Sequence, residues 1–141
     1  MSEKPFATAG CLCGAVRYTI HNPPVLMVQC HCKDCQKLSG TGHASQAFFR
    51  SEDVEMRGEA TAWSFESDRG TSKNYHFCPI CGSRLHGTNT GRPGLTILPI
   101  GCVDEHEWYE PAAVAYTSRR EAWDVTSNGI ANFDTMPPVK S

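Results

Sequence analysis

The chain has 141 residues, of which 40% are apolar and 20% charged, a composition typical of one globular domain spanning residues 1–141. Its 13 basic and 15 acidic side chains give a net charge of −2 and a pI near 6.3, so nucleic acid is not an expected partner. No apolar run approaches the ~20 residues that cross a bilayer, and the N-terminal segment lacks the apolar core of a secretory signal. We therefore expect a cytoplasmic protein with no membrane partner.

Eight short runs rich in β-branched and aromatic residues follow one another along the chain, bounded by turn-forming residues as strands are. They lie at residues 15–20, 25–30, 44–49, 54–57, 61–65, 73–77, 95–100 and 112–116. KDCQKLSG, residues 33–40, is the best helical turn, and SRREAW, residues 118–123, is a second candidate. GTNTGRPG, residues 87–94, has the composition of a loop. The pattern predicts an all-β domain that metal stabilises.

Eight cysteines are the most informative feature, because seven of them fall in three tight groups. The groups are CLCG (Cys11, Cys13), CHCKDC (Cys30, Cys32, Cys35) and CPICG (Cys78, Cys81), and Cys102 stands apart. Disulfides explain the grouping poorly, since a bridge within C-x-C closes a strained ring and cytosolic thiols stay reduced. Metal coordination explains it well, because a tight turn holds zinc-bound sulfurs within ~4 Å of one another. Gly14 and Gly82 follow two groups, where a knuckle requires positive φ.

Two of these groups can together supply the four thiolates of a structural zinc site. Cys11 and Cys13 with Cys78 and Cys81 would resemble a zinc ribbon whose knuckles lie far apart in the sequence. Metal binding at such a site contributes folding free energy directly. The sequence leaves the pairing open, because Cys11 and Cys13 could instead serve two of the middle three cysteines.

Cys30, Cys32 and Cys35 remain as three ligands on one short segment, the ligand count of a reactive zinc site with an open fourth position. Three thiolates leave the site with a charge of about −1, so it would activate water poorly but hold an exchangeable fourth thiolate well. We therefore expect a site suited to thiol substrates. Cys102 could close it as a fourth ligand, but its apolar, strand-like surroundings favour core packing.

Four histidines lie near the cysteine groups. His31 stands between two expected ligands, so its ring should point away from the ion. His43, His76 and His86 are expected to be hydrogen-bonded polar residues, or partners of a ligand, rather than ligands themselves.

The motifs CLCGAVRY, CHCKDCQKLSG and FCPICGSRL, in this order, resemble the signature of the glutathione-dependent formaldehyde-activating enzyme family, which includes the centromere protein V-like domains. IGCVDE and the segment from YEPAAVAY to FDTMPP extend the resemblance over nearly the whole chain. It implies a mainly antiparallel, Mss4-like β-tent with two Zn²⁺ per chain. The implied structural zinc lies on Cys11, Cys13, Cys78 and Cys81, and the implied reactive, catalytic zinc on Cys30, Cys32 and Cys35.

The resemblance also implies condensation of glutathione with formaldehyde to S-(hydroxymethyl)glutathione, classed in reverse as a carbon–sulfur lyase reaction. Zinc would activate the thiol for attack on the aldehyde carbon. The carboxylates of glutathione need cationic or N–H partners. Candidate cations near the motifs are Lys33, Lys37, Arg50, Arg69, Lys73, Arg84 and Arg92. The alternative function is that of a non-catalytic Mss4-like zinc module that binds another protein.

Overall fold

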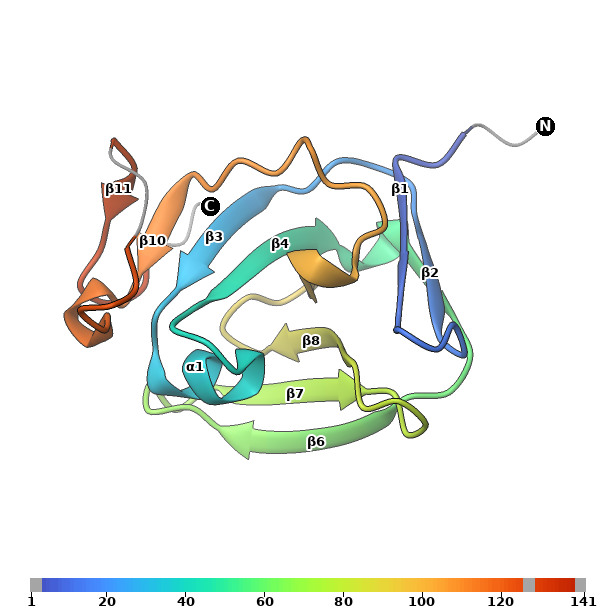
Figure 1. Ribbon diagram of the computed structural model, residues 1–141, viewed down its shortest axis with the longest axis horizontal. Coiled ribbons are helices and arrows are strands. Elements are labelled where there is room, and N and C mark those ends of the chain that lie inside the picture. The colour runs from blue at the N-terminus through green and yellow to red at the C-terminus, as the bar shows by residue number, and fades with distance from the viewer. Residues whose placement is uncertain (1–3, 126–128, 139–141) are drawn as a thin grey trace.

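The computed structural model describes residues 4–125 and 129–138, and within them β-structure predominates (Figure 1). The strands are β1 (Ala7–Gly10), β2 (Arg17–Ile20), β3 (Leu26–Cys30), β4 (Ala44–Arg50), β5 (Val54–Arg57), β6 (Thr61–Glu66), β7 (Ser72–Phe77), β8 (Arg84–Asn89), β9 (Leu95–Pro99), β10 (Ala113–Ala115) and β11 (Ala131–Asn132). The helical elements are α1 (Lys33–Ser39) and the 3₁₀ turns η1 (Ser51–Asp53), η2 (Ile100–Cys102) and η3 (Thr117–Arg119). Within the described residues, no helix has the length and apolar character to span a membrane.

The strands form two sheets. A three-stranded sheet has the order β1-β2-β5, and an eight-stranded sheet has the order β11-β10-β3-β4-β9-β8-β7-β6. Pairing between the strands is antiparallel except at β10, which runs parallel to β3 and β11. Figure 1 shows the β1–β2 hairpin and the β10–β11 pair at opposite ends of the molecule. The expected all-β, mainly antiparallel fold is confirmed.

Two buried clusters form the core, and each contains cysteines. The first packs Tyr18, Phe49 and Leu98 from both sheets around Cys11 and Cys78. The second lies on the eight-stranded sheet and packs all three cysteines of the CHCKDC motif with apolar residues of β3, β4 and β10. Apolar side chains on alternate positions of these strands account for the burial.

The eight predicted strands are all present, with bounds that differ by at most two residues. β8 was not predicted, and its last three residues fall in the segment expected to be a loop. Gly87 pairs there with Tyr75 of β7 and Ile97 of β9, so neighbouring strands override the weak strand propensity of Gly, Thr and Asn. Strands β1 and β11 were also missed. The second expected helical turn is only η3, which begins one residue earlier than SRREAW.

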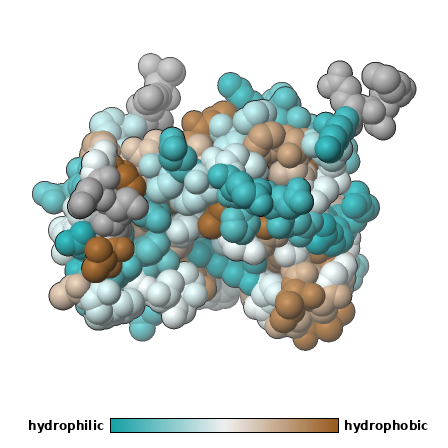
Figure 2. Space-filling model, turned by 45° about the horizontal axis from the view of Figure 1, so that its top comes forward, coloured by the Kyte–Doolittle hydropathy of each residue, from teal (hydrophilic) through white to brown (hydrophobic). Residues whose placement is uncertain are grey.

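The surface combines scattered apolar groups with a mostly hydrophilic face (Figure 2). Among the described residues, Leu12 and Ile80 are 90% and 74% exposed. Both lie within cysteine knuckles, where the chain turns so tightly that the intervening side chains point to solvent.

Candidate metal centres and the adjoining pocket

The first and last cysteine motifs each fold into a knuckle. The amide of Gly14 donates to the carbonyl of Cys11 at 3.2 Å, and the amide of Gly82 donates to that of Cys78 at 2.8 Å. Both glycines have positive φ, 84° and 79°, which explains their place after the cysteines. The amide of Leu12 donates to Ser83 Oγ at 3.0 Å and links the two knuckles.

The knuckles bring the sulfurs of Cys11, Cys13, Cys78 and Cys81 within 4.8 Å of one another. Cys13 Sγ lies 3.6 Å from Cys11 Sγ and 3.7 Å from Cys78 Sγ. A tetrahedral ion with bonds of about 2.3 Å requires sulfurs about 3.8 Å apart, so this donor set fits zinc. Hydrogen bonds from the side chain and backbone of Ser83 lower the pKa of Cys81 to about 5, as a thiolate ligand requires. The cluster also ties the β1–β2 hairpin to the turn between β7 and β8.

The middle motif places its cysteines where β3 ends and α1 begins. Cys30 is the last residue of β3, Cys32 caps α1, and Cys35 lies in the first turn. The amide of Cys35 donates to Cys32 Sγ at 3.3 Å, so the cap itself brings two sulfurs together. At the other end, Gly40 closes the helix in the left-handed conformation, as its sequence indicated.

These three sulfurs also lie within 4.8 Å of one another, and all three residues are buried. Hydrogen bonds from Cys30 and Cys35 lower the pKa of Cys32 to about 2. Hydrogen bonding to Cys32 in turn raises the pKa of Cys30 to about 12, and hydrogen bonding to Cys30 and then to Cys32 raises the pKa of Cys35. One thiolate is thus favoured and the next two are opposed, so three thiolates require a cation among them. The donor set fits a zinc ion.

Cys102 joins neither cluster. It ends η2 and packs against the first core cluster, and burial raises the pKa of its thiol to about 12. Within the described residues, the middle group of cysteines therefore has three members and no fourth cysteine.

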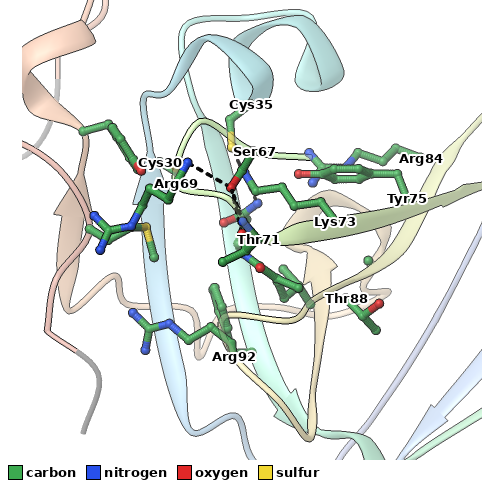
Figure 3. Close-up of a pocket in the computed structure, with 17 residues that line it drawn as sticks. Cys30, Cys35, Ser67, Arg69, Thr71, Lys73, Tyr75, Arg84, Thr88 and Arg92 are labelled. Atoms are coloured by element: carbon green, nitrogen blue, oxygen red, sulfur yellow. Dashed lines mark hydrogen bonds between the residues drawn. The ribbon is translucent and has the colours of Figure 1, made fainter. Parts of the chain in front are cut away.

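Cys30 and Cys35 line a pocket whose remaining wall comes from β4, β7, β8 and β9, from the connection between β6 and β7, and from Arg92, Tyr116 and Met136 (Figure 3). Four cations line it as well: Arg69, Lys73, Arg84 and Arg92. None of its lining residues is acidic, although Lys73 Nζ lies 3.9 Å from the Asp34 carboxylate outside it. The other three candidate cations, Lys33, Lys37 and Arg50, do not line this pocket.

Arg84 is the most unusual of these cations. Its guanidinium lies 4.7 Å from the centre of the Tyr75 ring, and its Nε and Nη1 atoms are buried without a hydrogen-bond partner. Buried guanidinium N–H groups are costly unless paired, so this side chain is prepared to receive an acceptor, preferably an anion.

Two tyrosines in the pocket were missed by the sequence analysis. Tyr75 and Tyr116 line it, and burial raises the pKa of both phenols, which therefore stay protonated at neutral pH. Tyr116 has a φ of 57°, the only positive value outside glycine in the described chain. Such strain in a non-glycine residue often marks a functional site. No sequence signal distinguished either residue, because each reaches the pocket through strand pairing.

The four histidines near the cysteine motifs form two pairs. His76 and His86 stack with ring centres 3.9 Å apart, and Tyr18 Oη lies 2.6 Å from His86 Nδ1. His31 and His43 instead form a group with Asp124 that is distinct from the two cysteine clusters.

Comparison with known proteins identifies the family and shows a structure with the same fold. The profile of the family described as "Glutathione-dependent formaldehyde-activating enzyme" matches residues 6–119. The crystal structure of a Rhodobacter sphaeroides protein shares the fold with a TM-score of 0.57 and 20% sequence identity, over 89% of this chain and 98% of that chain. Comparison with curated proteins gives no match. Because the family profile covers most of the chain, the protein belongs to the glutathione-dependent formaldehyde-activating enzyme family.

Proposed function

We propose that this protein is a zinc-dependent enzyme that joins a small anionic thiol to an aldehyde, as in the condensation of glutathione with formaldehyde. In reverse this is a carbon–sulfur lyase reaction. One observation carries the proposal: two of the three clustered cysteines line the same pocket as four cationic side chains. A thiol-binding centre beside anion-binding groups suits a thiol that bears carboxylates.

The two cysteine clusters have different roles in this proposal. Cys11, Cys13, Cys78 and Cys81 would hold a structural zinc, and Cys30, Cys32 and Cys35 a reactive one. Zinc bound to the three-cysteine cluster would hold the substrate thiol as its thiolate at neutral pH. The family match supports zinc binding, and the sulfur geometry supports these two ligand sets.

Arg84 would bind a carboxylate of the substrate. Its Nε and Nη1 atoms are unpartnered and already desolvated, so a carboxylate that accepts from either one gains a hydrogen bond without a further dehydration cost to the protein. Lys73, on the neighbouring strand β7, adds a second positive charge. The pocket volume is about 50 Å³, room for a few water molecules, so it would hold only the reacting end of a tripeptide.

The phenol groups of the pocket would donate a hydrogen bond or a proton to the aldehyde oxygen. As the thiolate sulfur bonds to the carbonyl carbon, the π-electron pair moves to oxygen, which then takes up one proton. Tyr116, which hydrogen-bonds with Arg69, and Tyr75 keep their protons at neutral pH and can donate to that oxygen. The sum is one thiolate, one aldehyde and one proton giving one hydroxymethyl thioether.

The test is the rate at which S-(hydroxymethyl)glutathione forms and breaks down, followed by exchange NMR with zinc-loaded protein. Wild type should accelerate the exchange, Cys35→Ser should not, and the matched variant Cys102→Ser should behave as wild type. Wild type with no acceleration at millimolar glutathione would refute the enzymatic proposal. The non-catalytic binding module would then be the better description.

A further inference from the structure

We propose that His31, His43 and Asp124 form a third metal centre, which binds a divalent transition-metal ion of the zinc type. It is separate from both cysteine clusters, and the proposed thiol chemistry does not require it. Their ligand atoms lie within 4.8 Å of one another.

The three side chains come from different parts of the chain and meet at one carboxylate oxygen. His31 lies between β3 and α1, His43 directly precedes β4, and Asp124 is 81 positions beyond His43. Asp124 Oδ2 lies 2.7 Å from His43 Nδ1 and 3.2 Å from His31 Nδ1. The two imidazole rings are 4.9 Å apart between centres and inclined at 39°.

His31 is the observation that points to a ligand. Its side chain is fully buried; the Asp124 carboxylate and the backbone of Gly42 lie near the ring, but neither ring nitrogen makes a hydrogen bond of acceptable geometry. Leaving both polar atoms of a buried imidazole unpartnered is unfavourable. A hydrogen-bonded triad would account for the short contact between His43 and Asp124, but it leaves His31 unsatisfied. A cation between the two Nδ1 atoms and Oδ2 would give each of these three atoms a partner.

The backbone at Gly42 lies close to the Asp124 carboxylate, and only glycine leaves room for this approach. A Cβ atom at Gly42 would lie 2.4 Å from Asp124 Oδ2 and 2.6 Å from Asp124 Cγ. Any other residue at position 42 would therefore push the carboxylate away from the imidazoles. The short segment that carries His43 is thus built around the Asp124 side chain.

The donor chemistry defines the class of ion. Two imidazoles and one carboxylate suit zinc and neighbouring first-row metals, whereas magnesium and calcium prefer oxygen donors alone. With neutral imidazoles, the occupied centre would carry a charge of about +1. Arg120 acts on His31 as a nearby positive charge and opposes the cation. The cysteine centre on either side of His31 in the chain, with a charge of about −1 when it holds zinc, offsets this repulsion.

An ion can reach the site from solvent. His43 lines a surface groove of about 750 Å³, and the side chains of His43 and Asp124 are 20% and 11% exposed. Three protein ligands also leave a coordination position for a fourth donor from the groove side, as in reactive zinc sites.

The test is to load the full-length protein with Co²⁺ and record its absorption during the titration. Thiolate ligands add sulfur-to-metal charge-transfer bands, whereas a nitrogen–oxygen site contributes only d–d bands. We expect wild type to bind one equivalent of Co²⁺ that raises the d–d absorption without raising charge transfer. A titration in which every bound equivalent adds charge transfer would overturn the proposal without the use of any variant.

Variants assign that equivalent to its ligands. His43→Gln should bind one metal ion per chain fewer than wild type and lose the d–d component alone. The matched control is His21→Gln, because His21 Nε2 also lies near a carboxylate, 3.3 Å from Glu55, but at an exposed site. Unchanged metal content in His43→Gln, or loss of its charge-transfer bands instead, would show that the histidines only support the cysteine centre.

Discussion

The two cysteine clusters should differ sharply in what they contribute to stability, and comparison of Cys81→Ser with Cys35→Ser tests this. The four-cysteine cluster, proposed as structural, joins two sheets through residues such as Cys13 and Cys78, which are 65 positions apart. The three-cysteine cluster, proposed as reactive, closes only the short segment from Cys30 to Cys35. A metal that closes a long loop removes more entropy from the unfolded chain.

The difference can be estimated from the two loop lengths. The chain-entropy relation gives about 2 kcal/mol more stabilisation for the 65-position closure than for a closure of 5 positions. For a domain of this size, that corresponds to roughly 5–10 °C in melting temperature. Serine is also penalised more at Cys35, which is 2% exposed, than at the half-buried Cys81. Burial alone would thus make Cys35→Ser the less stable variant, whereas the loop lengths predict that Cys81→Ser is less stable. A lower melting temperature for Cys81→Ser would therefore be decisive.

The assay is thermal melting with zinc analysis on both variants, side by side with Cys102→Ser, which measures the cost of the substitution at a half-buried cysteine outside both clusters. Cys81→Ser should be insoluble, or melt at least several degrees below Cys35→Ser, and Cys35→Ser should stay folded with one zinc fewer. The reverse order would refute the division into structural and reactive centres. Equal collapse of both variants would show that both centres are structural.

Three further results are expected. Arg84→Met should raise the KM for glutathione about tenfold or more, because a hydrogen bond to a charged group contributes roughly 1.5–3 kcal/mol. The surface variant Arg57→Met should leave the KM unchanged. An unchanged KM for Arg84→Met would show that Arg84 does not bind the substrate. Glutathione affinity should weaken as salt rises from roughly 0.05 to 0.5 M, because screening shortens the reach of the pocket cations; a flat profile would indicate binding by metal or apolar contacts alone. Burial and the neighbouring His76 lower the pKa of His86 from 6.5 to about 4, so its stabilising contribution is complete above pH 6.5 and is lost as the pH falls towards 4. Between pH 6.5 and 4, the melting temperature of His86→Gln should therefore fall less than that of wild type, when both contain the same amount of zinc. Parallel curves of melting temperature against pH for the two proteins would contradict this assignment.

Features with a short-range cause were predictable from the sequence. The knuckles depend on a turn and a glycine within four residues, and α1 depends on its caps at Cys32 and Gly40. The eight predicted strands were likewise marked by composition over a few residues each. These signals need no knowledge of the partner strand, so one sequence sufficed.

Features with a long-range cause were not predictable. Arg84 reaches the pocket because β8 pairs with β7, and Tyr116 reaches it from the end of β10, which runs parallel to β3. Asp124 meets His43 across 81 positions, and no local pattern distinguishes it from other acidic residues. Seven cations near the motifs were equivalent candidates in the sequence, and only the sheet order separates the four that line the pocket from the others.

Net charge and local charge also lead to different conclusions about partners. The chain is acidic overall, with a net charge of −2, and this argues against an extended polyanion such as nucleic acid. The pocket nevertheless gathers four cations and no acidic lining residue within one small volume. Screening confines the field of exposed charges to about 8 Å at physiological ionic strength, while buried charges such as Arg84 are screened less. A small anion inside the pocket therefore responds to these four cations rather than to the acidic surface, and an anionic thiol is compatible with an acidic protein.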